Sequence, residues 1–201
     1  MAEEMGIKKV AVVWANTEFG KGGHSAFLDE IGNFGIEIVA DIPTEQAQTD
    51  FSADVLKAKN SGADAVFVYV TEEESARFLR EAQKQSIGLP LIGETTLIGA
   101  KVIELAGDAA NGAMGHVGLT AAADIPAVQE MVTKFTEKFK YTPDHNAIKG
   151  YTAAYAIKCV TEKNGKVDSQ ALADAMHGLT LTAAECPGVL MDVSWDENGE
   201  M

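Results

Sequence analysis

The amino-acid sequence predicts an α/β fold: a parallel sheet flanked by helices, followed by C-terminal helices and a short strand. Short apolar runs rich in Val alternate with segments whose apolar residues recur at helical spacing. The elements follow the order β-α-β-α-β-α-β-α-β and then become mostly helical. Strands that alternate with helices in this way form a parallel sheet that helices cover on both faces.

Five strands are expected, each of them a short apolar run bounded by turn-forming or polar residues. They span residues 7–14, 36–42, 63–70, 89–93 and 114–119. Pro43 is expected to stop the second strand, because proline cannot donate a ladder hydrogen bond. Ligands bind parallel sheets at the carboxyl ends of the strands. The loops in which a site is therefore expected are 15–20, 43–49, 71–74 and 93–97.

The helices between these strands carry recognisable end signals. The first is expected to open at Gly20 and to end at Gly35, where a left-handed residue suits a helix C-terminus. Asp50 is expected to cap the second. Thr71 and Glu74 have the T-x-x-E spacing of a capping box and predict the start of the next helix. The inward face of the second helix is expected to hold Phe51, Val55 and Leu56.

The last third of the chain is predicted to be mostly helical. Pro126 opens a helix with a regular apolar stripe. Thr142 and Pro143 suit the N-cap and first position of a helix over about 144–163. This helix is apolar on nearly all of its faces, so it needs packing partners on several of them. A smaller helix over 172–179 and a weak strand over 189–195 follow. The apolar stripe of the helix that opens at Pro126 consists of Val128, Met131, Val132, Phe135 and Phe139.

The composition excludes several classes of protein. Hydrophobic residues make up 46% of the 201 residues and charged residues 23%, which is typical of a globular chain and excludes wholesale disorder. The 16 Lys and Arg against 30 Asp and Glu give a net charge of −14, so nucleic acid is not expected as a partner. No apolar run reaches the roughly 18 residues of a membrane span. The first residues carry no signal-peptide pattern.

Neither a metal, a cofactor nor a catalytic residue is predicted. The four histidines are scattered, and Cys159 and Cys186 do not have metal-ligand spacing. Two free thiols are the favoured interpretation of these cysteines, since a disulfide needs an oxidising compartment. The sequence lacks G-x-S-x-G and H-E-x-x-H motifs. An enzyme is therefore not expected, although catalytic triads can assemble from distant residues.

Three of the predicted strand ends carry candidate binding residues. Residues 19–23 follow the first strand but match neither G-x-G-x-x-G nor G-x-x-x-x-G-K-[ST]. They are interpreted as a flexible strand-to-helix turn, in which Phe19 could present an apolar face to a ligand. The acidic run 72–74 is interpreted as charge that complements a helix dipole. Glu94, Thr95 and Thr96 suit an ammonium group, or equally form a solvated loop with a helix cap.

Several segments together resemble a known family. In their order and spacing they resemble the type I periplasmic binding proteins of ABC importers, in the branched-chain amino-acid (Leu/Ile/Val) receptor branch. The series covers nearly the whole chain. The segments that carry the resemblance are 9–13, 19–22, 35–39, 49–52, 62–66, 78–82, 107–112 and 150–155.

The resemblance implies two α/β lobes joined by a hinge, with the ligand in the cleft between them. This sequence opens at what looks like the start of the second lobe. Residues 7–143 are expected to form that lobe, and residues 144–201 a helical segment that would return to the missing first lobe. The chain is therefore expected to be a fragment.

The resemblance also assigns the candidate site. Phe19 matches an aromatic residue that lines the cleft. Thr71 or Glu72 falls near the cleft position after the third strand, where the best-known members have tyrosine. Glu94 or Thr95 matches the acidic position that receives the ligand's ammonium group.

The expected function is that of the ligand-binding lobe of a non-enzymatic solute-binding protein, for ABC-type uptake of amino acids or similar small carboxylates. Its partners would be the small-molecule ligand and the importer's membrane permease, in a periplasmic or extracellular location. A ligand-sensing domain of the same fold from a receptor or regulator is the alternative, and an enzyme of flavodoxin-like architecture is a third. A homodimer through the C-terminal helices is also expected, because the apolar helix over 144–163 lacks its usual lobe.

Overall fold

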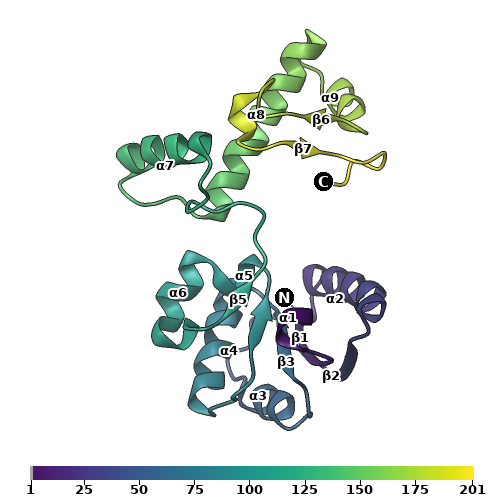
Figure 1. Ribbon diagram of the computed structural model, residues 1–201, viewed down its shortest axis with the longest axis vertical. Helices are drawn as coiled ribbons and strands as arrows, with labels where there is room; N and C mark the ends of the chain where they lie inside the picture. Colours follow the sequence, from purple (N-terminus) through teal and green to yellow (C-terminus); the bar gives the residue numbers. More distant parts are fainter. Residues whose placement is uncertain (1) are drawn as a thin grey trace. The chain divides into compact units, whose positions relative to one another are not determined.

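The computed structural model describes residues 2–201, and the chain divides into two compact units, Met1–Val117 and Gly118–Met201 (Figure 1). The domain boundary expected near residue 143 therefore falls inside the second unit. It lies between helices α7 (Pro126–Phe139) and α8 (His145–Asn164). These helices stay in one unit because Val128 and Met131 of α7 share an apolar cluster with Ile148 of α8.

The first unit is built on a five-stranded parallel sheet, which confirms the predicted fold class. Its strands lie in the order β2-β1-β3-β4-β5, and every neighbouring pair is parallel. Pro43 lies within β2 instead of stopping it, since β2 is an edge strand where a missing donor is tolerated. The strands are β1 (Lys9–Ala15), β2 (Glu37–Thr44), β3 (Ala65–Tyr69), β4 (Leu91–Gly93) and β5 (Met114–Gly115).

Helices cover the two faces of this sheet unequally. Alternate residues of β1, including Ala11 and Val13, pack into the larger core against α3 (Ser52–Lys59), α4 (Glu72–Lys84) and α6 (Ala100–Ala106). The opposite face carries α2 (Glu18–Ile31), and Figure 1 shows α2 and α6 on opposite sides of the strands. Short elements complete the unit. They are α1 (Ala2–Met5), η1 (Gly32–Phe34), α5 (Thr95–Ile98) and η2 (Gly107–Ala110).

Two of the predicted helix-end signals are confirmed. Gly35 adopts the left-handed conformation (φ 66°) after η1. Thr71 and Glu74 form the capping box of α4.

Two other predicted caps are wrong. Helix α3 begins at Ser52 with Phe51 as its N-cap, and Asp50 accepts a hydrogen bond from the Ser52 amide outside that position. Helix α8 is capped by Asp144, whose carboxylate accepts from the Ala147 amide, so Thr142 plays no part in the cap. The expectation that Leu56 faces inward is also wrong, since 51% of its surface is exposed.

The glycine-rich segment after β1 is helical, so its interpretation as a flexible turn is wrong. Thr17 caps α2 by accepting a hydrogen bond from the Gly20 amide. A Cβ atom at Gly20 would lie 1.7 Å from the carbonyl oxygen of Ala15. Glycine at this position therefore lets the helix start directly against the end of β1.

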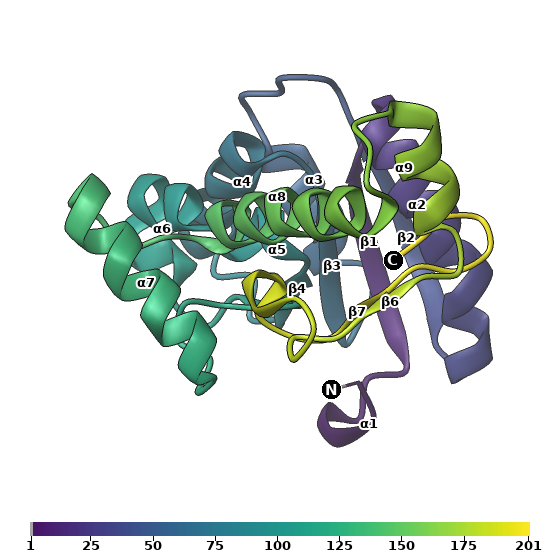
Figure 2. The same ribbon diagram turned by 90° about the horizontal axis from the view of Figure 1, so that it is seen from above.

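The second unit is mostly helical, as predicted. It holds α7, α8 and α9 (Ser169–Met176), together with η3 (Pro187–Val189) and the antiparallel strands β6 (Thr180–Leu181) and β7 (Val193–Ser194). Figure 2 shows β6 and β7 side by side. Helix α8 packs on two sides: Ile148 meets α7, while Ala156 and Val160 join a second apolar cluster with residues around η3.

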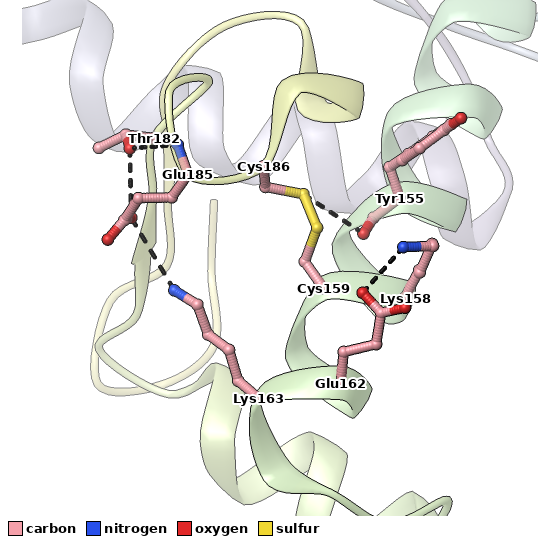
Figure 3. The surroundings of a disulfide bond; sticks show 8 residues. All are labelled: Tyr155, Lys158, Cys159, Glu162, Lys163, Thr182, Glu185 and Cys186. Atoms are coloured by element: carbon pink, nitrogen blue, oxygen red, sulfur yellow. Dashed lines mark hydrogen bonds and ion pairs between the residues drawn. A yellow bond between two sulfur atoms is a disulfide. The ribbon is translucent and has the colours of Figure 1, made fainter.

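A disulfide joins Cys159 of α8 to Cys186, just before η3 (Figure 3). The favoured interpretation of two free thiols is therefore wrong. The two Cα atoms lie 6.3 Å apart, within the range of native disulfides. The spacing of 27 residues could not reveal this pair, because the chain must first pass through α9 and β6 before it returns to α8. Cys186 is buried in the cluster around η3.

Within residues 2–201, no helix combines the length and the apolar character needed to cross a membrane. The same residues contain no group of three or more His, Cys, Asp or Glu side chains placed to hold a metal ion.

Loss of the disulfide should destabilise the second unit. Closing a loop of this length restricts the unfolded chain and stabilises the fold by about 3–4 kcal/mol. Thermal melting of the native protein with and without a reductant should show a lower transition temperature after reduction. A Cys159→Ser, Cys186→Ser double variant should have the transition temperature of the reduced protein, and adding reductant should not change it. An unchanged melting curve after reduction of the native protein would contradict this prediction.

Candidate functional site

The candidate site lies where three strand ends meet at one edge of the sheet. Strand β1 has β2 on one side and β3 on the other. The connection after β1 therefore leads to one side of β1, the connection after β2 leads back past β1 to the other side, and the strand order reverses between β1 and β3. In sheets of this order, ligands bind outside the carboxyl ends of the strands at this switch point. The segments that follow Ala15, Tyr69 and Gly93 all leave the sheet at this edge.

Two stacked aromatic rings stand at the switch point. Phe19, in the first turn of α2, keeps 44% of its surface exposed. Its ring stacks on that of Tyr69, the last residue of β3, with 4.5 Å between the centroids and 17° between the planes. Below them Phe67 stacks on Phe27 of α2 at 4.3 Å. The rings form a column between α2 and β3 that ends in the exposed face of Phe19.

Tyr69 is the residue that the sequence analysis missed. A signal was available, because Phe67 and Tyr69 lie two positions apart on one strand and so face the same side of the sheet. The column also depends on Gly23 of α2. A Cβ atom at this position would lie 2.1 Å from the Tyr69 ring, so glycine provides the space that the ring occupies.

Glu94 is the N-cap of α5 and holds a fixed carboxylate at the end of β4. One oxygen accepts the Thr95 amide at 2.6 Å and the Thr95 hydroxyl, and the other accepts the Thr96 amide at 2.9 Å. Partial burial acts to raise the pKa of the Glu94 carboxyl, but the hydrogen bonds from Thr95 and Thr96 outweigh it and lower the pKa below its usual value. Glu94 is therefore ionised at neutral pH, and the oxygen with one partner can accept another donor.

The negative charge of Glu94 acts on Tyr69, one of the stacked aromatic residues. The pKa of Tyr69 is raised, first by burial and then by the negative charge of Glu94. An anion and an exposed aromatic face at one edge of the sheet can together attract an ammonium group, through charge-assisted hydrogen bonding and cation–π contact. The helix-cap interpretation of Glu94 fits its hydrogen bonds, and the ammonium interpretation fits its charge and neighbours.

The other predicted site residues stand at the start of α4. Thr71 is exposed, and its amide and hydroxyl both donate to Glu74, at 3.0 and 2.8 Å. Glu72 is half-buried in the first turn of the helix. The structure thus stacks Phe19 on Tyr69 and brings the charge of Glu94 within electrostatic range of the Tyr69 hydroxyl. Thr95 is 7% exposed and donates its hydroxyl proton to Glu94, just as Thr71 donates its hydroxyl proton to Glu74.

A buried carboxylate fixes the loop after β2 at the same edge. Glu74 is 2% exposed, and its second oxygen accepts the amide of Ala47 at 2.7 Å. Arg77 supports the same loop by donating from Nη1 to the Gln48 carbonyl at 3.1 Å. The capping box alone predicts the bond to Thr71, but the bond to Ala47 depends on how the sheet folds.

Comparison with known proteins places this architecture in a family. Residues 1–200 match the periplasmic binding protein family. The chain belongs to this family. As a periplasmic binding protein it has curated relatives such as the Leu/Ile/Val-binding protein homolog 1 of Brucella abortus (strain 2308), which is 24% identical over 192 residues. That alignment covers 96% of this chain and 50% of the relative.

Solved substrate-binding and solute-binding proteins of ABC transporters share the fold over nearly the whole chain. The ABC transporter substrate-binding protein from Sphaerobacter thermophilus is 25% identical, with a TM-score of 0.84, and the alignment covers 98% of this chain and 54% of that protein. A solute-binding protein from Rhodopseudomonas palustris BisB5, solved with 3,4-dihydroxybenzoic acid, is 25% identical, with a TM-score of 0.78 and the same two coverages. The chain thus spans about half the length of these relatives.

The aromatic column should be sensitive to one methyl group. A Gly23→Ala substitution should displace the Tyr69 ring and cost about 1–3 kcal/mol of stability, as overpacking does. The matched control is Gly22→Ala, one residue earlier in α2, where a Cβ atom meets nothing within 4 Å. The control should be neutral or stabilise the helix by up to about 1 kcal/mol. Chemical denaturation measures both variants, and equal stabilities would show that the ring has room to move.

Proposed function

We propose that this chain forms the ligand-binding lobe of a solute-binding protein that delivers amino acids or similar small carboxylates to an ABC importer. The observation that carries the proposal is the ionised Glu94 carboxylate within electrostatic range of Tyr69, whose ring stacks on the exposed Phe19, at the sheet edge where such folds bind ligands. Glu94 receives the ammonium group, Thr95 holds the Glu94 carboxylate in place through its amide and hydroxyl, and Phe19 contacts the apolar part of the ligand. Thr71 and Glu72 line the same edge.

The charge of the site favours an amino acid over an aromatic acid. The relative from Rhodopseudomonas palustris was solved with 3,4-dihydroxybenzoic acid, and the relative from Brucella abortus is a Leu/Ile/Val-binding protein homolog. A benzoate brings a carboxylate and no cation, so a half-buried anion such as Glu94 repels it. An amino acid brings an ammonium group that can pair with Glu94, together with a side chain that can cover the exposed face of Phe19.

Several observations support a non-enzymatic protein outside the cytoplasm. The relatives are solute-binding proteins, and the edge of the sheet carries the ionised Glu94 carboxylate and the exposed ring of Phe19, which suit a bound solute. The Cys159–Cys186 disulfide is typical of an oxidising compartment such as the periplasm. The partner would be the membrane permease of the importer. The segment that joins the other lobe of a full-length relative would start near Gly118, where the second compact unit begins.

Binding of free amino acids to this chain should be weak and should depend on Glu94. An open site leaves the ion pair in water, so we expect L-leucine to bind only in the millimolar range. The amides of Thr95 and Thr96 should shift in NMR spectra during the titration. A Glu94→Gln variant should lose about tenfold or more in affinity, as for other charged hydrogen bonds.

The pH dependence follows from the lowered pKa of Glu94. Binding of leucine should be constant from neutral pH down to about pH 4.3, the ordinary pKa of a glutamate carboxyl, and should fall only below it, when Glu94 becomes protonated. The control is Glu73→Gln, an exposed charge on α4 that pairs with Arg77 at 3.5 Å. Equal losses at positions 94 and 73, or tighter binding of benzoate than of leucine, would contradict the proposal.

A homodimer through the second unit is part of the same proposal. This unit exposes large apolar side chains, among them Phe139 (48%), Tyr141 (60%) and Ile157 (49%). Such surfaces mark interfaces, and a closed two-fold dimer covers them in both copies.

Light scattering at tens of micromolar should therefore give a mass near twice 21.3 kDa. Ile157→Lys should shift the population toward monomer. Leu56→Lys, at a similarly exposed position of α3 in the first unit, should leave the mass unchanged. A native protein that remains monomeric would exclude the dimer.

A further inference from the structure

A groove between α4 and α6 concentrates positive charge on an acidic protein. The two helices pack side by side (Figure 1), and the groove has a volume of about 350 Å³. Three of its six lining residues are cationic, although the chain has a net charge of −14. Arg77 and Arg80, the only two arginines in the sequence, both line it. The lining consists of Glu73, Ala76, Arg77, Arg80, Lys101 and Leu105.

The cationic side chains of the groove form few hydrogen bonds and ion pairs within the part of the chain that the structure describes. Arg77 donates from Nη1 to the Gln48 carbonyl, and its Nη2 lies 3.5 Å from Glu73. Lys101 pairs with Glu104 on the surface of α6 at 3.1 Å. Arg80 is exposed and forms no hydrogen bond or ion pair within residues 2–201. The Arg77–Glu73 and Lys101–Glu104 pairs are exposed and contribute little, so these two cations can exchange those carboxylates for another one while Arg77 keeps its bond to Gln48.

The lining of the groove fits a carboxylate-bearing peptide. Arginine presents a planar fork of donors that matches a carboxylate in two-point contact. The groove is also lined by the buried Ala76 and the half-buried Leu105, so it offers apolar contact to the stem of a side chain. A small inorganic anion would leave this apolar surface uncovered.

The groove begins at the edge of the sheet that carries the candidate site. Glu73 lies in the first turn of α4, which follows β3, and Lys101 lies in the first turn of α6, which follows β4 and α5. A protein that docks on this edge can therefore reach the groove. We propose that the groove between α4 and α6 docks an acidic peptide segment of a partner protein, whose carboxylates pair with Arg80, Lys101 and Arg77.

The test uses a fluorescent hexaglutamate peptide and the native protein at low salt. We expect binding that raises the anisotropy of the peptide, with NMR shifts confined to α4 and α6. Arg80→Gln and Lys101→Gln should each weaken binding about threefold, the effect expected for one exposed ion pair. The double variant should weaken it about tenfold. Both positions are exposed, and melting curves should confirm that the variants fold.

The matched control is Lys84→Gln. Lys84 lies on the same helix and is exposed, but it pairs with Glu81 at 3.0 Å and does not line the groove. The control changes the net charge as much as Arg80→Gln does, so it measures general electrostatic attraction. Binding that survives Lys84→Gln and is lost in the double variant supports the proposal. Equal effects of Lys84→Gln and Arg80→Gln, displacement of the peptide by an equal concentration of inorganic phosphate, or no binding would each overturn it.

Discussion

Strand β1 is enclosed on every side, and the arrangement of the first unit follows from that enclosure. Its neighbours β2 and β3 satisfy its backbone groups on both edges. Its residues Ala11, Val12 and Val13 have no exposed surface. A strand with apolar residues on both faces needs a helical layer on each side, and parallel pairing requires each connection to cross from one end of the sheet to the other. These two requirements bring the loops after β1, β3 and β4 to one edge.

Two carboxylates at that edge show how the same group can serve different purposes. Glu74 and Glu94 both accept backbone amides at a helix start. Glu74 is 2% exposed and spans two segments of the chain, so its hydrogen bonds are used in fixing the loop after β2. Glu94 bonds only to the two residues that follow it, stays half-buried and lies within electrostatic range of Tyr69. Its charge is therefore available to a ligand, whereas the charge of Glu74 is not.

Local signals in the sequence predicted the fold class, whereas contacts between residues far apart in the sequence were not predicted. The alternation of Val-rich runs with helical segments was sufficient for the parallel sheet, and the Thr71–Glu74 spacing was sufficient for a helix start. Asp50 failed as a cap because helix entry also depends on how Phe51 packs, and Phe51 is buried. For the candidate site, Phe19 and Glu94 could be proposed from their places after strands.

Tyr69 and the disulfide show why the rest was not predicted. The role of Tyr69 depends on the space left by Gly23, 46 positions earlier in the sequence and on a different element. The partner of Cys159 is brought back to α8 only after α9 and β6 have formed. Pairings of this kind are set by the path of the chain in space, which residue spacing does not encode.

The same disulfide gives part of the second unit the topology of a covalent ring. Residues 159–186 form a closed loop that contains the end of α8, all of α9 and β6. Val167, in the turn between α8 and α9, is 95% exposed and so lies open to proteases. A single cut there opens the ring but releases no fragment, because the Cys159–Cys186 bond still joins the two pieces. A nicked molecule would run at full mass on a non-reducing gel and would separate into two bands only after reduction.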